Sequence, residues 1–544
     1  MAFGPAFGCL AGKAVRRAIR CSLAALIVFV LAACSTLPPG SDYPRTASVA
    51  LAHPEQTRLG RQFDEAARRH DGESGFRAIA AGVDGFLIRM QMINAAERTL
   101  DLQYFIFRGD ETGRLLTDAV LHAADRGVRV RVLVDDADTE VGDGQLDIVG
   151  KHAGIEIRIF NPFTYRGDAK LLRAIEFMFN ASRLDYRMHN KLLVVDNALA
   201  LLGGRNIGDQ YFQINPASQF ADEDVLAAGP IVPHLSATFD AYWNSGLAIP
   251  SAALRLARPA QPSLAEHRAA LHEEAHALKA AGVDYVTRVA SGEPLAGILA
   301  GRLPLVWARA QVVCDSPDKK QVLSGAQVGY LMQATVADAA AAVRSELLLI
   351  TPYMVPDREE MRMLAALRRR DVRVRVLTNS LESTPELLAH AGYMHYRLPL
   401  LEDGVELYEI RSRLGNTSGS GQSAAISRFG TYSLHAKLFV FDRQRLFIGS
   451  MNFDERSMHL NTELGLIIDS PALAQQAAQR FDAMVQPANA YAVALQRNAG
   501  AAPTLVWRTL EGGQPVEYTS EPARSDRQRI KANFLSLLPL DAEL

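Results

Sequence analysis

The feature that most constrains the fold of this 544-residue chain is an internal repeat. The stretch MHNKLLVVDNALALLGGRN, residues 188–206, returns as LHAKLFVFDRQRLFIGSMN, residues 434–452, with His, Lys, Asp, Gly and Asn at identical spacings. A second shared block, VRVRVL, precedes each copy and begins at Val128 and at Val372. Matching segments in the same order over such lengths indicate two copies of one structural unit.

Each unit is predicted to be an α/β domain. The segments 93–107 and 121–136 have the pattern helix, strand, helix, strand, which recurs over 343–356 and 364–380. Short strands rich in β-branched residues and separated by helical patterns favour a largely parallel or mixed sheet. We therefore expect two similar α/β/α sandwich domains related by a pseudo-two-fold axis, with an active site at their interface.

The first domain is expected over residues 58–250 and the second, with a C-terminal extension, over 311–544. Residues 251–310 are Ala-rich with helical spacing and are expected to form a helical connection without chemistry of its own. The Gly/Ser-rich stretch 413–430 lies just ahead of the second motif. It is either a plain surface insertion or a loop that gates the site.

The N-terminus has the pattern of an export signal. Four basic and no acidic residues accompany the apolar run SLAALIVFVLAAC, which ends at Cys34 and is short for a membrane span. We expect a signal peptide over 1–33 and a flexible tether over 34–57. Leu31–Cys34 resembles a bacterial lipoprotein cleavage box. This resemblance implies lipidation of Cys34 and, because Ser35 follows, the outer membrane of a Gram-negative envelope, facing the periplasm. A plain signal peptide or an uncleaved anchor is the alternative.

The charge balance argues against a nucleic-acid partner. Without residues 1–33 the chain has 54 basic and 60 acidic residues, a balance of −6, whereas general nucleic-acid binders usually have a basic excess. Cys314 is the one cysteine left once Cys34 is lipidated, so no intrachain disulfide is expected. No Cys/His or His/carboxylate ligand spacing is evident, so neither a metal nor another cofactor is predicted.

The repeated motif is predicted to form a β-hairpin. Residues two apart in a strand face the same side, so His189 and Lys191 project together. Asp196 marks the turn at the far end, where we expect it to support the backbone rather than to contact a substrate. Gly204 and Asn206 end the returning strand near His189. The second copy places its residues in the same way: His435, Lys437, Asp442, Ser450 and Asn452.

Two such hairpins across a pseudo-two-fold axis would gather two imidazoles, two ammonium groups and two amides. This set suits a phosphodiester, because one histidine can attack phosphorus while the other protonates the leaving oxygen. Lysine, asparagine and backbone donors can hold the phosphate oxygens. The predicted catalytic residues are His189, Lys191, Asp196, His435, Lys437 and Asp442, and the predicted phosphate-binding residues are Asn206, Asn452, Ser450 and Gly204.

A histidine nucleophile needs an orienting acid. Glu463 follows the second motif and Asp222 follows the first, so we predict that these two carboxylates stand behind the two histidines. The alternative is that either one is an exposed carboxylate without such a role.

The doubled motif resembles that of the phospholipase D superfamily, His-x-Lys-x4-Asp-x6-Gly-Ser-x-Asn; Gly204 departs from it, where the family usually has Ser. The segments 100–116, 203–212 and 450–463 are similar to the bacterial cardiolipin synthase group, especially its exported C-type members. The resemblance implies that His189 is the nucleophile and His435 the acid/base group.

The same resemblance implies transfer of a phosphatidyl group between phospholipids, with phosphatidylglycerol and phosphatidylethanolamine as candidate substrates. Water as the acceptor would give phosphatidic acid instead. A phosphodiesterase acting on nucleic acid and a non-catalytic lipid-binding lipoprotein are the rival classes. Since one chain holds both motifs, a monomer is expected to be sufficient for activity.

Overall fold

The computed structural model describes residues 38–137, 143–167, 169–214, 218–254, 262–414, 431–497 and 502–538. Three predictions concern residues outside these ranges: the signal peptide over 1–33, the lipidation of Cys34, and most of the Gly/Ser-rich stretch, over 415–430. Among the described helices, none has the length and apolar character that crossing a bilayer would require.

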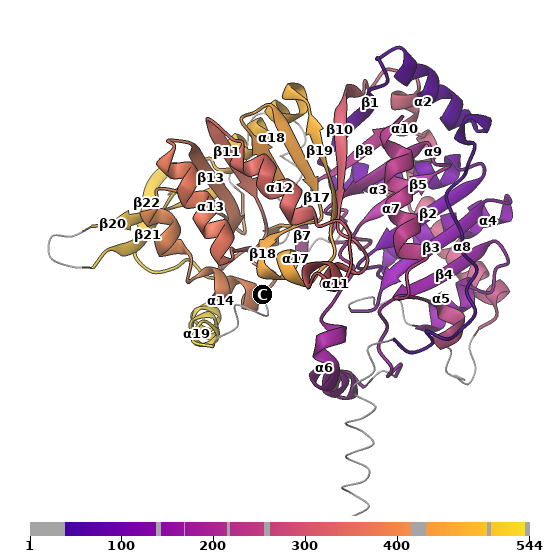
Figure 1. Ribbon diagram of the computed structural model, residues 1–544, viewed down its shortest axis with the longest axis horizontal. Helices are drawn as coiled ribbons and strands as arrows, with labels where there is room; N and C mark the ends of the chain where they lie inside the picture. Colours follow the sequence, from indigo (N-terminus) through magenta and orange to yellow (C-terminus); the bar gives the residue numbers. More distant parts are fainter. Residues whose placement is uncertain are drawn as a thin grey trace, which may run out of the picture.

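The first half is built on a mixed sheet with helices on both faces (Figure 1). Its parallel strands are β2 (Thr99–Tyr104), β3 (Arg129–Asp135) and β4 (Ile155–Phe160). Antiparallel strands complete it: β9 (Ala248–Pro250) beside β4, and β5 (Leu192–Val195), β6 (Leu199–Gly203), β8 (Asp224–Ala228) and β1 (Ser74–Ile79) in turn beside β2. The carboxyl ends of the parallel strands therefore meet at one edge of the sheet.

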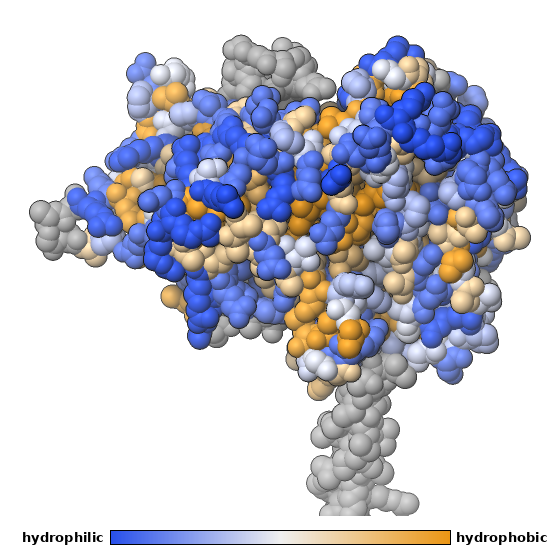
Figure 2. Space-filling model, turned by 45° about the horizontal axis from the view of Figure 1, so that its top comes forward, coloured by the Kyte–Doolittle hydropathy of each residue, from blue (hydrophilic) through white to orange (hydrophobic). Residues whose placement is uncertain are grey.

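Helices of the first half cover both faces of this sheet. One face shares an apolar core with α3 (Gly82–Ala95), α4 (Glu111–Asp125), α5 (Asp143–Val149), α8 (Leu264–Ala280), α9 (Asp284–Ser291) and α10 (Leu295–Leu299), and the other packs against α7 (Ile231–Trp243). The remaining helices are η1 (Pro54–Gln56), α2 (Arg58–Arg68), η2 (Ser251–Leu254) and α6 (Lys170–Leu184). Helix α6 projects from the lower end of this half, where apolar side chains gather on the surface (Figure 1 and Figure 2).

The second half repeats the strand order of the first and adds two further strands at its outer edge. Its parallel strands are β11 (Glu346–Ile350), β13 (Arg373–Asn379) and β14 (Glu406–Ile410). Beside β11 follow β16 (Leu438–Phe441), β17 (Arg445–Gly449), β19 (Leu464–Asp469) and β10 (Val306–Cys314), and beside β14 follow β20 (Ala490–Gln496), β21 (Thr504–Glu511) and β22 (Gln514–Tyr518). This arrangement confirms the predicted pair of similar α/β domains.

Helices of the second half follow the same layered plan. One face of the sheet packs with α12 (Met332–Ala341), α13 (Arg358–Arg369), α14 (Leu387–Tyr393) and α15 (Arg397–Glu402), and the other packs with α18 (Pro471–Met484). Short helices α11 (Lys319–Leu323) and α17 (Glu455–His459) lie near the junction of the halves, and α19 (Asp526–Leu535) is the last described helix (Figure 1).

The two halves are joined at the level of both sheet and core. Strands β1 and β10 pair antiparallel, with Gly75 opposite Trp307, so the two sheets form one continuous 18-stranded sheet. Helices α7 and α18 share a single apolar core. Two short parallel pairs complete the structure: β7 (Ser218–Ala221) with β15 (Thr431–Leu434), and β12 (Met354–Val355) with β18 (Phe453–Asp454).

The flexible tether expected over 34–57 needs correction for its described part. The Arg45 guanidinium donates to the carbonyl oxygen of Ser245 at 3.1 Å, and the Ala50 amide donates to the Asp240 carboxylate at 2.8 Å. These contacts bind residues 45–50 to the end of α7, because the segment supplies backbone donors and acceptors that the domain surface satisfies.

The helical connection expected over 251–310 also differs from a linker. Helices α8, α9 and α10 bury Leu271, Tyr285 and Ile298 in the core of the first domain, so they form one of its layers. The predicted boundary before residue 311 falls inside β10, which pairs with both β1 and β19. An Ala-rich helical pattern shows that helices form, but not what they pack against.

Candidate active site

Each repeated motif forms a β-hairpin with a two-residue turn. In the first copy, Asp196 and Asn197 connect β5 to β6 with φ values of 53° and 49°. In the second, Asp442 and Arg443 connect β16 to β17 with φ values of 53° and 54°. Two successive left-handed residues are typical of hairpins whose turn follows the twist of the strands. Strand β5 begins at Leu192, so the first histidine and lysine lie just ahead of the hairpin.

The two motif aspartates lie at the far ends of the hairpins from the histidines. The Asp196 carboxylate accepts backbone hydrogen bonds from Glu97, Arg98 and Thr99 at 2.7–2.9 Å. Asp442 accepts the equivalent backbone bonds from Arg344, Ser345 and Glu346. Each aspartate therefore accepts the hydrogen bonds of the backbone amides at the start of the first parallel strand of its own half.

Each histidine is held by a carboxylate from the other half of the chain. His189 Nδ1 lies 2.9 Å from Glu463 Oε2, and His435 Nδ1 lies 2.6 Å from Asp222 Oδ2. Both histidines are 7% exposed, and both acids are buried. A carboxylate at Nδ1 fixes the orientation of the ring. Nε2 of His435 lies 3.2 Å from Lys437 Nζ, so the lysine stands beside the nitrogen that faces away from the acid.

The backbone reinforces this exchange between the halves. The His189 amide donates to the carbonyl oxygen of Thr462 at 2.9 Å, and the His435 amide donates to that of Ala221 at 2.7 Å. Thr462 and Ala221 are the residues directly before the two acids, so each histidine segment runs beside the acid segment of the opposite half. The β7–β15 pair continues one of these contacts, with Ala221 opposite Leu434.

The two carboxylates differ in charge at neutral pH. Burial raises the pKa of Glu463 to about 7, although Lys191 and the Ser450 hydroxyl oppose this shift. Burial acts in the same direction on Asp222, but His435 and Lys437 outweigh it and hold the pKa of Asp222 at about 2. Asp222 therefore stays ionised, whereas Glu463 is close to its midpoint.

Both motif imidazoles are held in the neutral form. Burial, reinforced by Lys191 and Lys437, lowers the pKa of His189 well below its ordinary value. Burial and Lys437 lower the pKa of His435 to about 3, against the effect of Asp222. Lysines of both halves act on His189, which agrees with a single site at the junction.

The lysines lie against the histidine backbone. Lys191 Nζ donates to the carbonyl oxygen of His189 at 2.6 Å, and Lys437 Nζ donates to that of His435 at 2.5 Å. Burial lowers the pKa of Lys437 to about 8 and lowers that of Lys191 well below its ordinary value. Two buried ammonium groups without a paired carboxylate each make this junction suitable for a bound anion.

The predicted phosphate-binding residues have different environments in the two halves. The Asn206 side chain is already engaged, since Oδ1 accepts from the Ile106 amide and Nδ2 donates to the Tyr211 hydroxyl, both at 3.1 Å. By contrast, Asn452 Oδ1 is buried without a hydrogen-bond partner among the described residues. Ser450 donates to Glu463 through its hydroxyl. The two motif asparagines therefore differ in their hydrogen bonding, although they occupy equivalent places in the repeat.

Gly204, where the second copy has Ser450, has no room for a side chain. A Cβ atom built there would lie 2.0 Å from Asp222 Oδ1. The shorter Asp222 therefore occupies space that a serine would need, while the longer Glu463 leaves room for Ser450. Two positions therefore differ together between the halves. The first half has Gly204 beside Asp222, and the second has Ser450 beside Glu463.

Several residues around the histidines are missing from the sequence-based prediction. The Phe105 ring meets His189 edge-on with centroids 5.0 Å apart, and Phe220 stacks on His435 at 5.2 Å. Tyr211 meets His435 edge-on at 5.3 Å, and the Ser457 hydroxyl donates to Glu463 at 2.8 Å. The run of aromatic residues directly after a predicted strand, in QYFIF, was the available signal for Phe105.

Comparison with known proteins identifies the family. The family model described as "Cardiolipin synthase, PLD-like domain" matches residues 90–243 and 337–485, one stretch in each half and together more than half of the chain. The chain belongs to the phospholipase D-like cardiolipin synthase family. The family predicted from the doubled motif is thereby confirmed.

Relatives within the PLD-like family cover most of the chain. "Cardiolipin synthase C" of Escherichia coli (strain K12) is 35% identical over 87% of this chain and 97% of its own length. "Major cardiolipin synthase ClsA" of Bacillus subtilis (strain 168) is 26% identical over 77% of this chain and 71% of its own length. Among solved structures, phosphatidylserine synthase of Haemophilus influenzae Rd KW20 has 13% identity and a TM-score of 0.48, covering 78% of this chain and 90% of its own.

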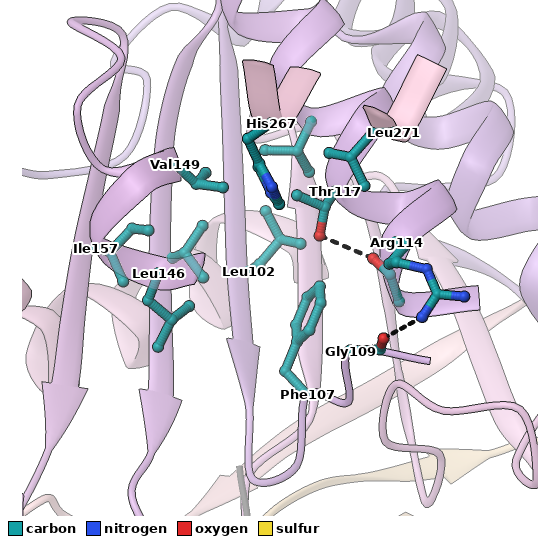
Figure 3. Close-up of a pocket in the computed structure, with 13 residues that line it drawn as sticks. Leu102, Phe107, Gly109, Arg114, Thr117, Leu146, Val149, Ile157, His267 and Leu271 are labelled. Atoms are coloured by element: carbon teal, nitrogen blue, oxygen red, sulfur yellow. Dashed lines mark hydrogen bonds between the residues drawn. The ribbon is translucent and has the colours of Figure 1, made fainter. Parts of the chain in front are cut away.

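An apolar pocket lies apart from the PLD-like motifs, between the first sheet and its outer helices (Figure 3). Leu102, Phe107 and Leu271 are among its lining residues, and Arg114 at its side is paired with Glu274 at 2.6 Å. The lining contains neither motif histidine and neither motif lysine. Its lining includes one histidine, His267, but not the pair of histidines and the pair of lysines that the two motifs bring together.

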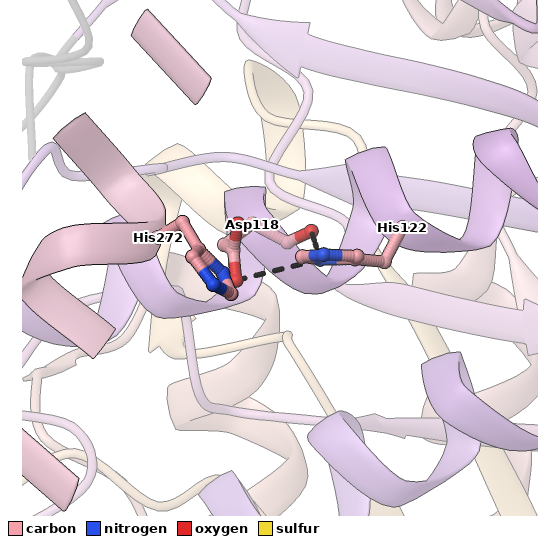
Figure 4. Close-up of side chains that lie close together, drawn as sticks. All are labelled: Asp118, His122 and His272. Carbon is pink, nitrogen blue, oxygen red and sulfur yellow. Dashed lines mark hydrogen bonds and ion pairs between the residues drawn. The ribbon is translucent and has the colours of Figure 1, made fainter. Parts of the chain in front are cut away.

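Asp118, His122 and His272 form a group that could hold a metal ion (Figure 4). One ligand atom from each lies within 4.8 Å of the others. The group sits on α4 and α8, in the outer helical layer, and two of its three residues are exposed. No spacing along the sequence indicated it, because α8 is far from α4 in the chain.

Proposed function

We propose that this chain is a phosphatidyltransferase of the cardiolipin synthase type that works through a phosphohistidine intermediate. The observation that carries the proposal is the exchange of carboxylates, by which each of two neutral imidazoles at the junction of the halves has its Nδ1 held by an acid of the opposite half. Its membership of the PLD-like family and its likeness to "Cardiolipin synthase C" support the reaction type.

In the first step, His189 Nε2 forms a bond to phosphorus while the bond from phosphorus to the departing alcohol oxygen breaks. Binding of an anionic phosphodiester favours protonation of His435, and the ionised Asp222 stabilises the resulting imidazolium. His435 gives this proton to the departing oxygen. Lys191 and Lys437 neutralise the charge on the non-bridging phosphate oxygens.

In the second step, the hydroxyl group of an acceptor lipid loses its proton to His435 and attacks phosphorus, which breaks the bond to His189. With phosphatidylglycerol as the acceptor the product is cardiolipin, and with water it is phosphatidic acid. The proton that His435 gives to the departing oxygen in the first step is replaced by the proton that it takes from the acceptor in the second. The cycle therefore consumes only the two substrates. The motif aspartates maintain the hairpins and take no part in either step.

Tethering at a membrane through a lipidated Cys34 is part of the proposal, as are an envelope location and activity as a monomer. A tether would raise the local concentration of phospholipid at the site. The net balance of −6 without the signal peptide argues against a nucleic-acid substrate.

The direct test supplies the full-length protein with isotopically labelled phosphatidylglycerol, with phosphatidylethanolamine, and with both lipids mixed. Cardiolipin among the products supports the transferase, and phosphatidic acid alone indicates a phospholipase D hydrolase. Absence of both products, with His189→Ala as the blank, would refute the proposal. Comparing palmitate labelling of the parent and of Cys34→Ala tests the anchor separately.

A further inference from the structure

Helix α6 presents its apolar face to solvent rather than to the protein. Leu171, Ile175 and Met178 share one side of the helix and are exposed, with Leu171 and Met178 each 73% exposed. None of these side chains belongs to an apolar core of the described residues. A surface helix normally buries its apolar stripe, so this orientation requires an explanation.

The polar side of α6 is the side bound to the protein. Glu176 accepts hydrogen bonds from the amides of Thr164 and Tyr165 at 2.6 and 2.7 Å, and Arg183 donates to the carbonyl oxygen of Pro162 at 2.8 Å. These polar contacts hold the helix with its apolar row pointing outward. The exposure therefore follows from a defined orientation of α6.

Helix α19 has the same inverted arrangement in the second half. Ile530 and Phe534 lie on α19 at positions i and i+4, which align on one helix face, and are 68% and 63% exposed. Leu537, 81% exposed, follows in the turn just after the last helical residue, Leu535. On the bound side of α19, Gln528 donates to the carbonyl oxygen of Leu381 at 2.7 Å.

Both helices stand at the sheet edge where the histidines lie. Helix α6 follows β4 and ends at Leu184, shortly before His189 in the chain. Helix α19 packs on α14 and on Leu381, just beyond the carboxyl end of β13, where Asn379 bonds both the amide and the carbonyl of the residue before His435. Figure 1 shows α6 and α19 projecting from the same lower side of the molecule.

Basic side chains accompany these apolar rows. Lys170 precedes Leu171, and Arg527 and Lys531 lie on either side of Ile530; all three are exposed, and none has an acidic partner among the described residues. An apolar face flanked by Lys and Arg is typical of helices that lie in the surface of a membrane containing anionic lipids. Figure 2 shows apolar residues clustered on the surface at the lower end of the first half, at α6.

We propose that the apolar rows of α6 and α19 dock the protein on an anionic phospholipid surface, with the edge that carries His189 and His435 turned toward the bilayer. The inference deepens the proposed function, since it places a lipid surface in front of a site that would consume phospholipid. It requires no lipid anchor, although an anchor would act in the same direction. The docking is a property of the folded domains.

Insertion can be measured in the full-length protein bound to phosphatidylglycerol/phosphatidylethanolamine vesicles. Tryptophan is introduced as Met178→Trp, as Phe534→Trp and, for the control, as Val49→Trp, and the emission added to that of the parent is recorded. Val49 is 62% exposed but lies on the segment bound to α7, away from both rows. Lipids brominated on their acyl chains should remove most of the added emission at positions 178 and 534 and little of it at position 49.

The consequence for turnover is tested with paired charge substitutions. Leu171→Glu with Met178→Glu, and Ile530→Glu with Phe534→Glu, should each lower turnover of vesicle phospholipid by at least ~10-fold, the usual worth of one buried apolar side chain. Turnover of a short-chain phospholipid in monomeric solution should stay within about twofold of the parent, because docking does not change the chemistry of the site. Val49→Glu should change neither rate.

Unquenched tryptophan at positions 178 and 534 on vesicle-bound protein would overturn the docking proposal, and so would equal quenching at all three positions. Failure of the proposed function has a different signature, because a protein without phospholipid turnover would still show quenching. If a charge pair lowers the midpoint of thermal unfolding, the matching Gln pair replaces it, and an unchanged vesicle rate for that pair also counts against docking.

Discussion

The acid behind His189 and the acid behind His435 occupy equivalent places in the two halves, yet they differ in size, neighbours and charge. Glu463 accepts hydrogen bonds from Ser450 and Ser457, and burial brings its pKa to about 7. Asp222 lies against Gly204 and is held ionised by His435 and Lys437. A repeat that is symmetrical in sequence can therefore support two histidines with unequal electrostatics, which suits two different roles in one reaction.

The largest expected effect comes from removing either imidazole. His189→Ala and His435→Ala should each lower turnover by ~10²–10⁴-fold, the usual worth of an acid/base group. Trapping the covalent intermediate distinguishes the two histidines. With labelled phospholipid, His435→Ala should still form a labelled phosphohistidine, and His189→Ala should form none. Label on His189→Ala alone would reverse the assignment of roles.

The difference in charge predicts a difference in the pH dependence of stability. The pKa of Glu463 is about 7 in the folded chain, against an ordinary value of 4.5, so the folded state keeps a proton that the unfolded state releases. Protonation of Glu463 should therefore contribute up to about 3 kcal/mol of stability that is lost as the pH rises from 4.5 to 7, and Glu463→Gln should remove this contribution. The lowered pKa values of His189 and His435 act in the opposite direction in both proteins, so the test is the difference between the two stability curves.

Denaturant titrations of the parent and the variant at several pH values measure this difference. Asp222→Asn is the matched control, because Asp222 is already ionised throughout the interval and its substitution should give a flat difference curve. If the difference in unfolding free energy between the parent and Glu463→Gln did not change over this interval, the proton would belong to another group.

The steric difference predicts that the motif glycine and serine are not interchangeable. Gly204→Ser restores the motif but places Cβ against Asp222, so it should lower the free energy of unfolding by about 1–3 kcal/mol, as other overpacking changes do. Ser450→Gly should cost less, since it creates no clash and removes only the two hydrogen bonds of the hydroxyl, which donates to Glu463 and accepts from the Leu464 amide. Equal effects of the two substitutions would show that Asp222 can move aside without cost.

The smallest effect on turnover is expected from substitutions at the turns of the two hairpins. Asp196→Asn should lower the free energy of unfolding by about 1–3 kcal/mol, since it removes a buried carboxylate that accepts three backbone bonds. Asp442→Asn should cost less, because Asp442 is less deeply buried. Turnover per folded molecule should stay unchanged in both, and a loss comparable with that of His189→Ala would contradict a purely supporting role.

Much of this architecture could be predicted from the sequence because its signals are local. The alternation of helix and strand, the Asp196 turn and the doubled hairpin each depend on residues close together in the chain. The pairing of His189 with Glu463 depends on how two halves meet, and no spacing along the chain encodes that. The same reason explains why residues 45–50 appeared free and why the Asp118, His122 and His272 group remained unseen.

The carboxylate exchange has a consequence for how such a chain can evolve. Each motif histidine is oriented by an acid of the opposite half, so a gene encoding one half alone would need a second copy of its product before the motif imidazole was oriented. Duplication and fusion would have preserved that dependence inside one polypeptide. A substitution at position 222 would then be selected through its effect on His435 of the opposite half. Since a side chain at position 204 would meet Asp222, families of such proteins should show positions 204 and 222 changing together while His435 is retained.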